Sequence, residues 1–169
     1  MSRLWIAGAL LASGMALGER YDHHGALGVT VAAGGEYVTA IGVLSGIENG
    51  FRIPLELGGT LSVSNHNELR LAARLSPGVV LTTLSTSFFA GVRNTIGYEQ
   101  WKTFFDLELA VHATPFFAIG ARAAFGVQYD FFPIMGVYAQ LGAQLGGATS
   151  LRLSFEVMAG LQFRTYLFE

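Results

Sequence analysis

The chain has 169 residues, of which 51% are hydrophobic and only 13% are charged, and its mean hydropathy is +0.45. This length allows one domain, and the charged fraction lies well below the roughly 25% of an average soluble domain. The net charge of −2 supplies no basic patch for a nucleic acid, so we expect no nucleic-acid partner. Because the chain has no cysteine, disulfides, thiolate metal sites and a cysteine nucleophile are excluded.

The first eighteen residues have the three-part layout of a secretory signal peptide. Met1 to Arg3 carry one positive charge, Leu4 to Leu17 are apolar, and Ala16-Leu17-Gly18 is a small-x-small triplet. The alternatives are a short N-terminal anchor or a buried first helix, but the apolar stretch is too short to span a bilayer as a helix. We therefore expect a signal peptide over 1–18, cleaved after Gly18, and a single domain over 19–169.

From residue 26 onward, apolar and polar residues alternate with a period of two, which is typical of strands with two different faces. Phe51 to Val63 is the clearest case, because its odd positions are mostly Phe, Ile, Leu and Val and its even positions include Arg, Glu, Gly, Thr and Ser. The same test predicts eight strands, at 26–43, 52–63, 68–76, 79–93, 101–112, 116–129, 136–146 and 151–167.

The first of these strands contains Gly34-Gly35, which could instead be a two-residue hairpin turn. The alternation keeps its phase through both glycines, and glycines inside a strand also mark a kink or bulge in a barrel wall. We interpret 26–43 as one long strand.

The charged residues separate cleanly by phase. Fourteen lie within the predicted strands, and every one occupies the polar phase: Glu36, Arg52, Glu56, Glu68, Arg70, Arg74, Arg93, Lys102, Asp106, Glu108, Arg122, Arg152, Glu156 and Arg164. Eight are basic and six acidic. Since buried charges persist when they are paired, we expect a charge network along a barrel axis, made by all of these residues except Glu68 and Arg93.

Alternation alone does not say which face is inside, because a soluble barrel has an apolar lumen and a membrane barrel an apolar exterior. The apolar phase is too bulky for an eight-stranded lumen, as in the run Phe105, Leu107, Leu109, Val111. The polar phase mixes arginines with Gly and Ala, which suits a narrow, filled interior. We therefore predict an all-β fold, an antiparallel up-and-down transmembrane β-barrel of eight strands.

Short connections rich in Gly, Pro, Asn, Asp and Ser favour a meander without crossover helices. Pro54 lies inside a predicted strand, where it costs a ladder hydrogen bond. Either regular pairing begins near Leu55, or this end of the strand projects beyond the membrane.

Many aromatic residues lie near the predicted strand ends, where the interfacial girdles of membrane barrels belong. They are Tyr37, Phe51, Tyr98, Trp101, Phe104, Phe116, Phe117, Tyr129, Phe131, Phe132, Tyr138, Tyr166 and Phe168.

In architecture, residues 25 to 169 resemble the small eight-stranded outer-membrane barrels, the class of the OmpA transmembrane domain and OmpX. The segments 102–112, 126–130 and 162–168 further resemble barrel proteins of myxobacterial type. The resemblance implies a fold and a location, the bacterial outer membrane, and contact with outer-membrane lipid and with the barrel-assembly machinery. It also implies an aromatic residue at the end of the last strand as an assembly signal. Tyr166 and Phe168 share the phase of Arg164, so a bulge near Thr165 would be needed to turn them outward.

Residues for chemistry are few. His112 lies in the polar phase near Glu108, and Ser85, Ser87 and Ser154 could carry a nucleophile, but a lone histidine near a strand end is more often hydrogen-bonded than catalytic. His23-His24 and His66 are weak metal candidates, and no glycine-rich phosphate loop occurs. We expect no catalytic, cofactor or metal site.

We therefore expect a monomeric, non-enzymatic outer-membrane barrel with a filled interior, no open pore, and a structural or anchoring role. The alternatives are a secreted soluble barrel that binds an apolar ligand in its lumen, in the manner of lipocalins, and a lipid-modifying barrel enzyme.

Overall fold

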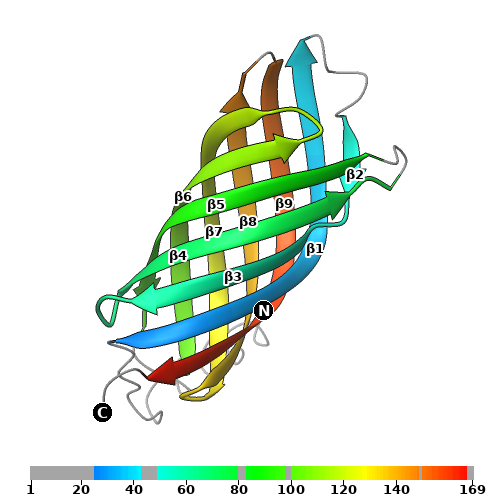
Figure 1. Ribbon diagram of the computed structural model, residues 1–169. Coiled ribbons are helices and arrows are strands. Elements are labelled where there is room, and N and C mark those ends of the chain that lie inside the picture. The colour runs from blue at the N-terminus through cyan, green and yellow to red at the C-terminus, as the bar shows by residue number, and fades with distance from the viewer. Residues whose placement is uncertain (1–24, 43–48, 80–82, 98–99, 149, 167–169) are drawn as a thin grey trace, which may run out of the picture.

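The computed structural model describes residues 25–42, 49–79, 83–97, 100–148 and 150–166. The strands of these residues form one antiparallel sheet, which closes on itself because the first strand pairs with the last (Figure 1). Their bounds are β1 Ala26–Gly42, β2 Gly50–Arg52, β3 Leu55–Ser62, β4 Asn67–Pro77, β5 Leu84–Ile96, β6 Trp101–Thr114, β7 Ala118–Phe132, β8 Met135–Gly147 and β9 Ser150–Tyr166. The described part of the chain contains no helix long and apolar enough to cross a membrane.

The strands β2 and β3 occupy a single position in the barrel wall, so these nine strands make an eight-stranded barrel. Both pair with β1, and Ile53-Pro54 separates them. Proline has no N–H to donate to the ladder, and Pro54 contributes only its carbonyl, which accepts from the Gly34 N–H at 3.1 Å. Pairing with β1 is present on both sides of this proline, in β2 over Gly50–Arg52 and in β3 from Leu55 onward, so Pro54 interrupts the ladder and does not mark its beginning. The expectation that regular pairing begins near Leu55 therefore holds for β3 alone.

The strand β1 runs without a break through Gly34-Gly35 and pairs with β9 along its whole length. The prediction of one long strand is therefore confirmed, and the hairpin alternative is wrong. A Cβ on Gly35 would lie 2.8 Å from the Phe51 ring, and one on Gly34 would lie 2.0 Å from the Val157 carbonyl oxygen. The two glycines are needed because the wall and an aromatic side chain approach the backbone closely here.

The strands are staggered around the barrel. Following register partners across the sheet from Thr30 through β3 to β9 leads to Arg152, and Arg152 pairs with Ala40, ten residues further along β1. Such a stagger goes with strands tilted by roughly 35–45° and with an interior that side chains can fill.

Most predicted strands are confirmed with shifted ends. The strand predicted at 79–93 corresponds to β5, which spans Leu84–Ile96, and residues 80–82 of the predicted strand lie outside the described residues. The strands predicted at 101–112 and 116–129 extend to Thr114 and Phe132. The signal peptide predicted for 1–18 lies outside the described residues.

The end of β9 pairs regularly with β1 up to Tyr166, opposite Ala26. The bulge that would turn the last aromatic residues outward is therefore absent near Thr165. Tyr166 is half-buried, and its hydroxyl donates to the Pro133 carbonyl at 3.4 Å. Phe168 lies outside the described residues.

The two faces of the wall differ sharply in polarity. Large apolar side chains point outward, and among them Leu71 is 66% and Leu141 62% exposed. All fourteen charged residues of the predicted strands are buried in the lumen instead. The soluble alternative required an apolar lumen, so its central premise is contradicted.

Candidate functional site

The charged lumen is the candidate site, and the period of the strands positions it. Successive residues of a strand point to opposite faces, so carboxylates and guanidiniums at alternating positions of β3, β4, β6, β7 and β9 all project into one narrow space. Inward glycines make room for them. A Cβ on Gly142 would lie 2.7 Å from Glu156 Oε1, and one on Gly91 2.6 Å from the Glu108 Cα.

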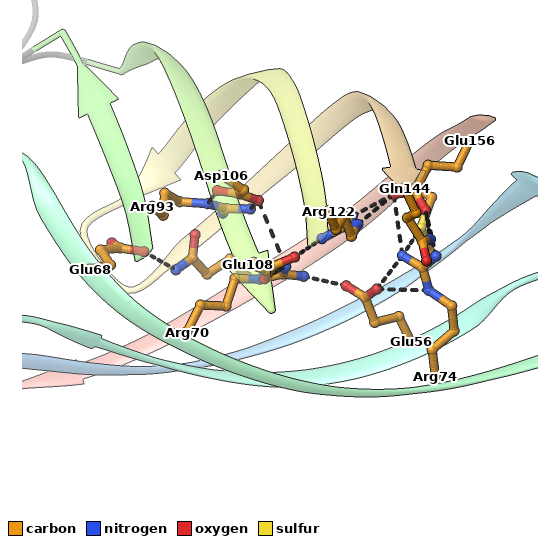
Figure 2. A network of polar contacts seen from close by, with 12 residues as sticks. Glu56, Glu68, Arg70, Arg74, Arg93, Asp106, Glu108, Arg122, Gln144 and Glu156 are labelled. Carbon is orange, nitrogen blue, oxygen red and sulfur yellow. Dashed lines mark hydrogen bonds and ion pairs between the residues drawn. The ribbon is translucent and has the colours of Figure 1, made fainter. Parts of the chain in front are cut away.

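Six of these residues form a closed ring of ion pairs across the lumen (Figure 2). Acid and base alternate around it, and the order is Glu56, Arg70, Glu108, Arg122, Glu156 and Arg74, which pairs again with Glu56. We call this set the ion-pair ring. Its three carboxylates balance its three guanidiniums, so the ring is neutral as a whole.

The contacts within the ring are direct hydrogen bonds between charged groups. Arg74 donates from Nε and Nη2 to Glu56 Oε2 at 3.0 and 2.6 Å, and Arg122 donates from Nε to Glu156 Oε1 at 2.9 Å. Gln144 adds a bond from Nε2 to Glu156 Oε2 at 2.9 Å. Charge-assisted bonds of this kind are about twice as strong as neutral ones, and they hold side chains of five strands to one another.

The buried side chain of Phe89 packs against two arginines of the ion-pair ring. The guanidinium carbons of Arg74 and Arg122 lie 4.6 and 5.1 Å from the centre of the buried Phe89 ring. Phe89 clusters with Ala72 and Ala110, so an apolar patch of the lumen supports the cations by cation–π contact.

A second layer joins an ion pair to a cluster of interior aromatic side chains. Arg93 binds Asp106 with two bonds, Nε to Oδ1 at 2.7 Å and Nη2 to Oδ2 at 2.8 Å, and its guanidinium carbon lies 3.8 Å from the centre of the Phe104 ring. Phe104 contacts Tyr138 edge to face at 5.9 Å. The prediction that Phe104 and Tyr138 belong to an interfacial girdle is wrong, since they are only 1% and 3% exposed.

A third layer lies at the end of the barrel where β1 begins and β9 ends, which we call the terminal end (Figure 1). Asp130 accepts from Lys102 Nζ at 2.7 Å, from Arg164 Nη1 at 3.1 Å and from Gln128 Nε2 at 2.6 Å. Glu68 lies 3.8 Å from Arg164. At this end the exposed Trp101 also packs at 4.8 Å on the half-buried Tyr129, in keeping with a girdle.

The opposite end, which we call the far end, holds Arg52, Arg152 and Glu36. Arg152 lies 3.6 Å from Glu36, and Arg52 donates to the Ser76 carbonyl at 3.4 Å. These contacts are longer than those of the ion-pair ring.

All twelve residues expected in the network lie in the lumen, and the ion pairs named above group them by height along the barrel. Six form the ion-pair ring, Asp106 lies 3.7 Å from Arg70, and the others belong to the separate layers at the two ends. Sequence reasoning missed Asp130, because the strand was predicted to end one residue before it, and left out Glu68 and Arg93. All three occupy polar positions of the alternating pattern and lie on the inward face. The alternation in the sequence could therefore have identified them.

The structure brings together one serine and one histidine. Ser87 Oγ lies 2.7 Å from His112 Nδ1, and Arg152 Nη1 lies 3.3 Å from the same nitrogen. Ser87 and His112 are 3% and 2% exposed, so no substrate can reach them in this state. Among the described residues, neither Ser85 nor Ser154 has a hydrogen-bond partner for its buried hydroxyl, and no carboxylate is bonded to His112.

Metal ligation finds no support in the described residues, where no three His, Asp or Glu side chains gather in a way that could hold an ion. His66 Nδ1 lies 3.0 Å from the Thr95 carbonyl oxygen, and His23-His24 lie outside the described residues.

Comparison with known proteins identifies the fold. No family model and no curated protein matches the chain, so the myxobacterial resemblance stays a prediction. Three similar solved structures are the N-terminal β-barrel domain of Pseudomonas aeruginosa OprF (TM-score 0.62, 12% identity, covering 84% of this chain and 98% of that one), Neisserial surface protein A (0.61, 14%, 82% and 96%) and the outer membrane protein OprG from Pseudomonas aeruginosa (0.59, 9%, 88% and 98%). The chain therefore has the fold of the small outer-membrane barrels.

Proposed function

We propose that this protein is an integral protein of the bacterial outer membrane, a monomer with a structural or anchoring role and no open pore. In this proposal the outward apolar face contacts lipid, the segment 1–18 directs export, and the barrel-assembly machinery inserts the chain. The proposal extends the fold, which is that of outer-membrane barrels, to a location and a role.

The observation that carries the proposal is the division of the wall into an apolar exterior and a charged, filled lumen. In water, a surface with so many exposed leucines, valines and phenylalanines would associate. In a bilayer the same surface is favourable, and the pairing of β1 with β9 closes the sheet, so the backbone groups along that seam bond to one another instead of facing lipid.

The absence of a pore is proposed because side chains occupy the lumen in successive layers. The ion-pair ring crosses it, and the Phe104, Tyr138 and Met158 side chains form a buried apolar cluster in it. An eight-stranded barrel has an interior that side chains just fill. A hydrated ion would have to separate charged partners to pass.

We propose no enzymatic role. The Ser87 and His112 pair is the strongest candidate for chemistry, but it is buried, and no acidic side chain of the described strands bonds to the histidine. We interpret the pair as part of the packing of the far end.

Two measurements on the expressed full chain test the proposal. Flotation of washed membranes in a density gradient should place the protein with outer-membrane lipid, and planar-bilayer recording of the purified barrel should show no steady conductance. Recovery as soluble periplasmic material would refute the location, and stable single-channel currents would refute the filled lumen. The double variant Glu108→Ala/Arg122→Ala is the positive control. It removes two side chains of the ion-pair ring from the lumen and should therefore raise the conductance.

A further inference from the structure

The outer surface of the barrel is not smooth, because it contains apolar hollows. Two adjoining apolar hollows of 620 and 780 Å³ lie on it, the first over β1, β3, β4, β5 and β6 and the second over β9, β1, β3, β4 and β5. They share Leu57, Ala73 and Phe88, which are register partners on three neighbouring strands. The two hollows are therefore parts of one continuous depression, which we call the outer groove.

Small outward side chains create the outer groove. Gly59, Ala73 and Ala90 lie at outward positions of β3, β4 and β5, and Ala33 and Ala159 do so on β1 and β9. The neighbouring outward residues are large, so the small ones form a floor between leucine and phenylalanine walls. On β6, by contrast, the outward residues from Phe105 to Val111 are all large.

We propose that the outer groove binds an acyl chain of a membrane phospholipid more tightly than the rest of the barrel surface does. This inference rests on the proposed membrane location, and it adds a specific partner and a specific site. An acyl chain in the groove contacts protein atoms below it and on both sides. An acyl chain on a flat part of the barrel contacts protein atoms on one side only. Since dispersion attraction grows with the number of atom contacts, an acyl chain should stay bound in the groove longer than on the rest of the barrel surface.

The distribution of charge selects the occupant. Every described Asp, Glu, Lys and Arg side chain is buried in the lumen, so the outward face of the described strands offers no charge to a headgroup or to a charged protein partner. Of the described residues that line the groove, Thr86 alone presents a polar side chain on the outward face. The site therefore recognises the hydrocarbon chain, and its affinity should not depend on headgroup charge.

Native mass spectrometry of the full-length barrel tests this proposal. The protein is released from vesicles made of phosphatidylethanolamine and phosphatidylglycerol with identical acyl chains, after flotation has shown insertion. We expect lipid adducts of both headgroups in equal proportion on the wild-type barrel. Ala73→Phe fills the floor shared by both hollows and should lower the adduct population at least fivefold.

Ala143→Phe is the matched control. It adds the same side chain to the outward face of β8, where the partners Ala123 and Phe155 line neither hollow, and it should leave the adducts unchanged. If Ala73→Phe does not insert, Ala90→Phe replaces it. Equal adducts on wild type and groove variants, preference for one headgroup, or a dimer in place of the lipid would overturn the proposal. A barrel that does not float refutes the proposed function instead.

Discussion

Replacing Arg122 with methionine tests the energetic role of the ion-pair ring. Arg122 is fully buried and binds Glu108 and Glu156, and each of these carboxylates keeps one other guanidinium, from Arg70 or Arg74. Without Arg122 the ring becomes an open chain of three carboxylates and two guanidiniums, with one negative charge uncompensated in a space closed to water. Breaking a buried ion pair in this way costs about 3–5 kcal/mol. Because both carboxylates keep a partner, we expect about 3 kcal/mol, the low end of this range.

Urea unfolding of the barrel in phospholipid vesicles measures this loss. Trp101 reports on it, since it is the only tryptophan after residue 18 and lies exposed at the terminal end. The double variant Arg122→Met/Glu108→Gln restores the balance of two acids and two bases in the ring, so it should be more stable than Arg122→Met alone. A loss below about 1 kcal/mol, the size expected for an exposed pair, or a double variant less stable than the single one, would refute the reasoning.

Three further predictions concern the two faces of the wall. Leu107→Asp places a carboxylate at the middle of the outward face and should prevent stable insertion in a flotation assay, whereas Ala113→Asp near the end of the same strand should insert. Gly126→Ala brings a Cβ within 2.3 Å of an interior aromatic ring and should lower stability in urea unfolding by about 1–3 kcal/mol. Gly59→Ala should be tolerated, because its nearest neighbouring atom would lie 3.8 Å away. Gln140→Met replaces a buried amide that has no hydrogen-bond partner, so the urea midpoint should stay the same or rise, and a clear fall would contradict the buried state of that amide.

The sequence predicted the faces of the wall well, because alternation is a local property. Each inward arginine or carboxylate follows from its phase within a single strand, and the closed barrel keeps that phase around Gly34-Gly35. The break in the ladder at Pro54 was predictable for the same reason, because a missing N–H removes a hydrogen bond at that residue itself.

The pairing of interior groups could not be predicted in the same way. Which guanidinium meets which carboxylate depends on the stagger of the strands, and the stagger is a property of the closed barrel. Arg74 therefore reaches Glu156, which lies far away in the sequence. Phe104 and Tyr138 were misplaced because an aromatic residue near a strand end belongs to a girdle only when its phase is outward.

The central claim is that the protein is a membrane-embedded barrel with its apolar face outward. Its most direct test is mobility on an SDS gel, with and without boiling, of the washed membrane fraction from cells that express the full chain. A folded barrel held by a closed sheet and an internal ion-pair ring should run as a compact band that shifts to the unfolded position on heating. Soluble periplasmic protein whose mobility does not change on boiling would contradict the claim.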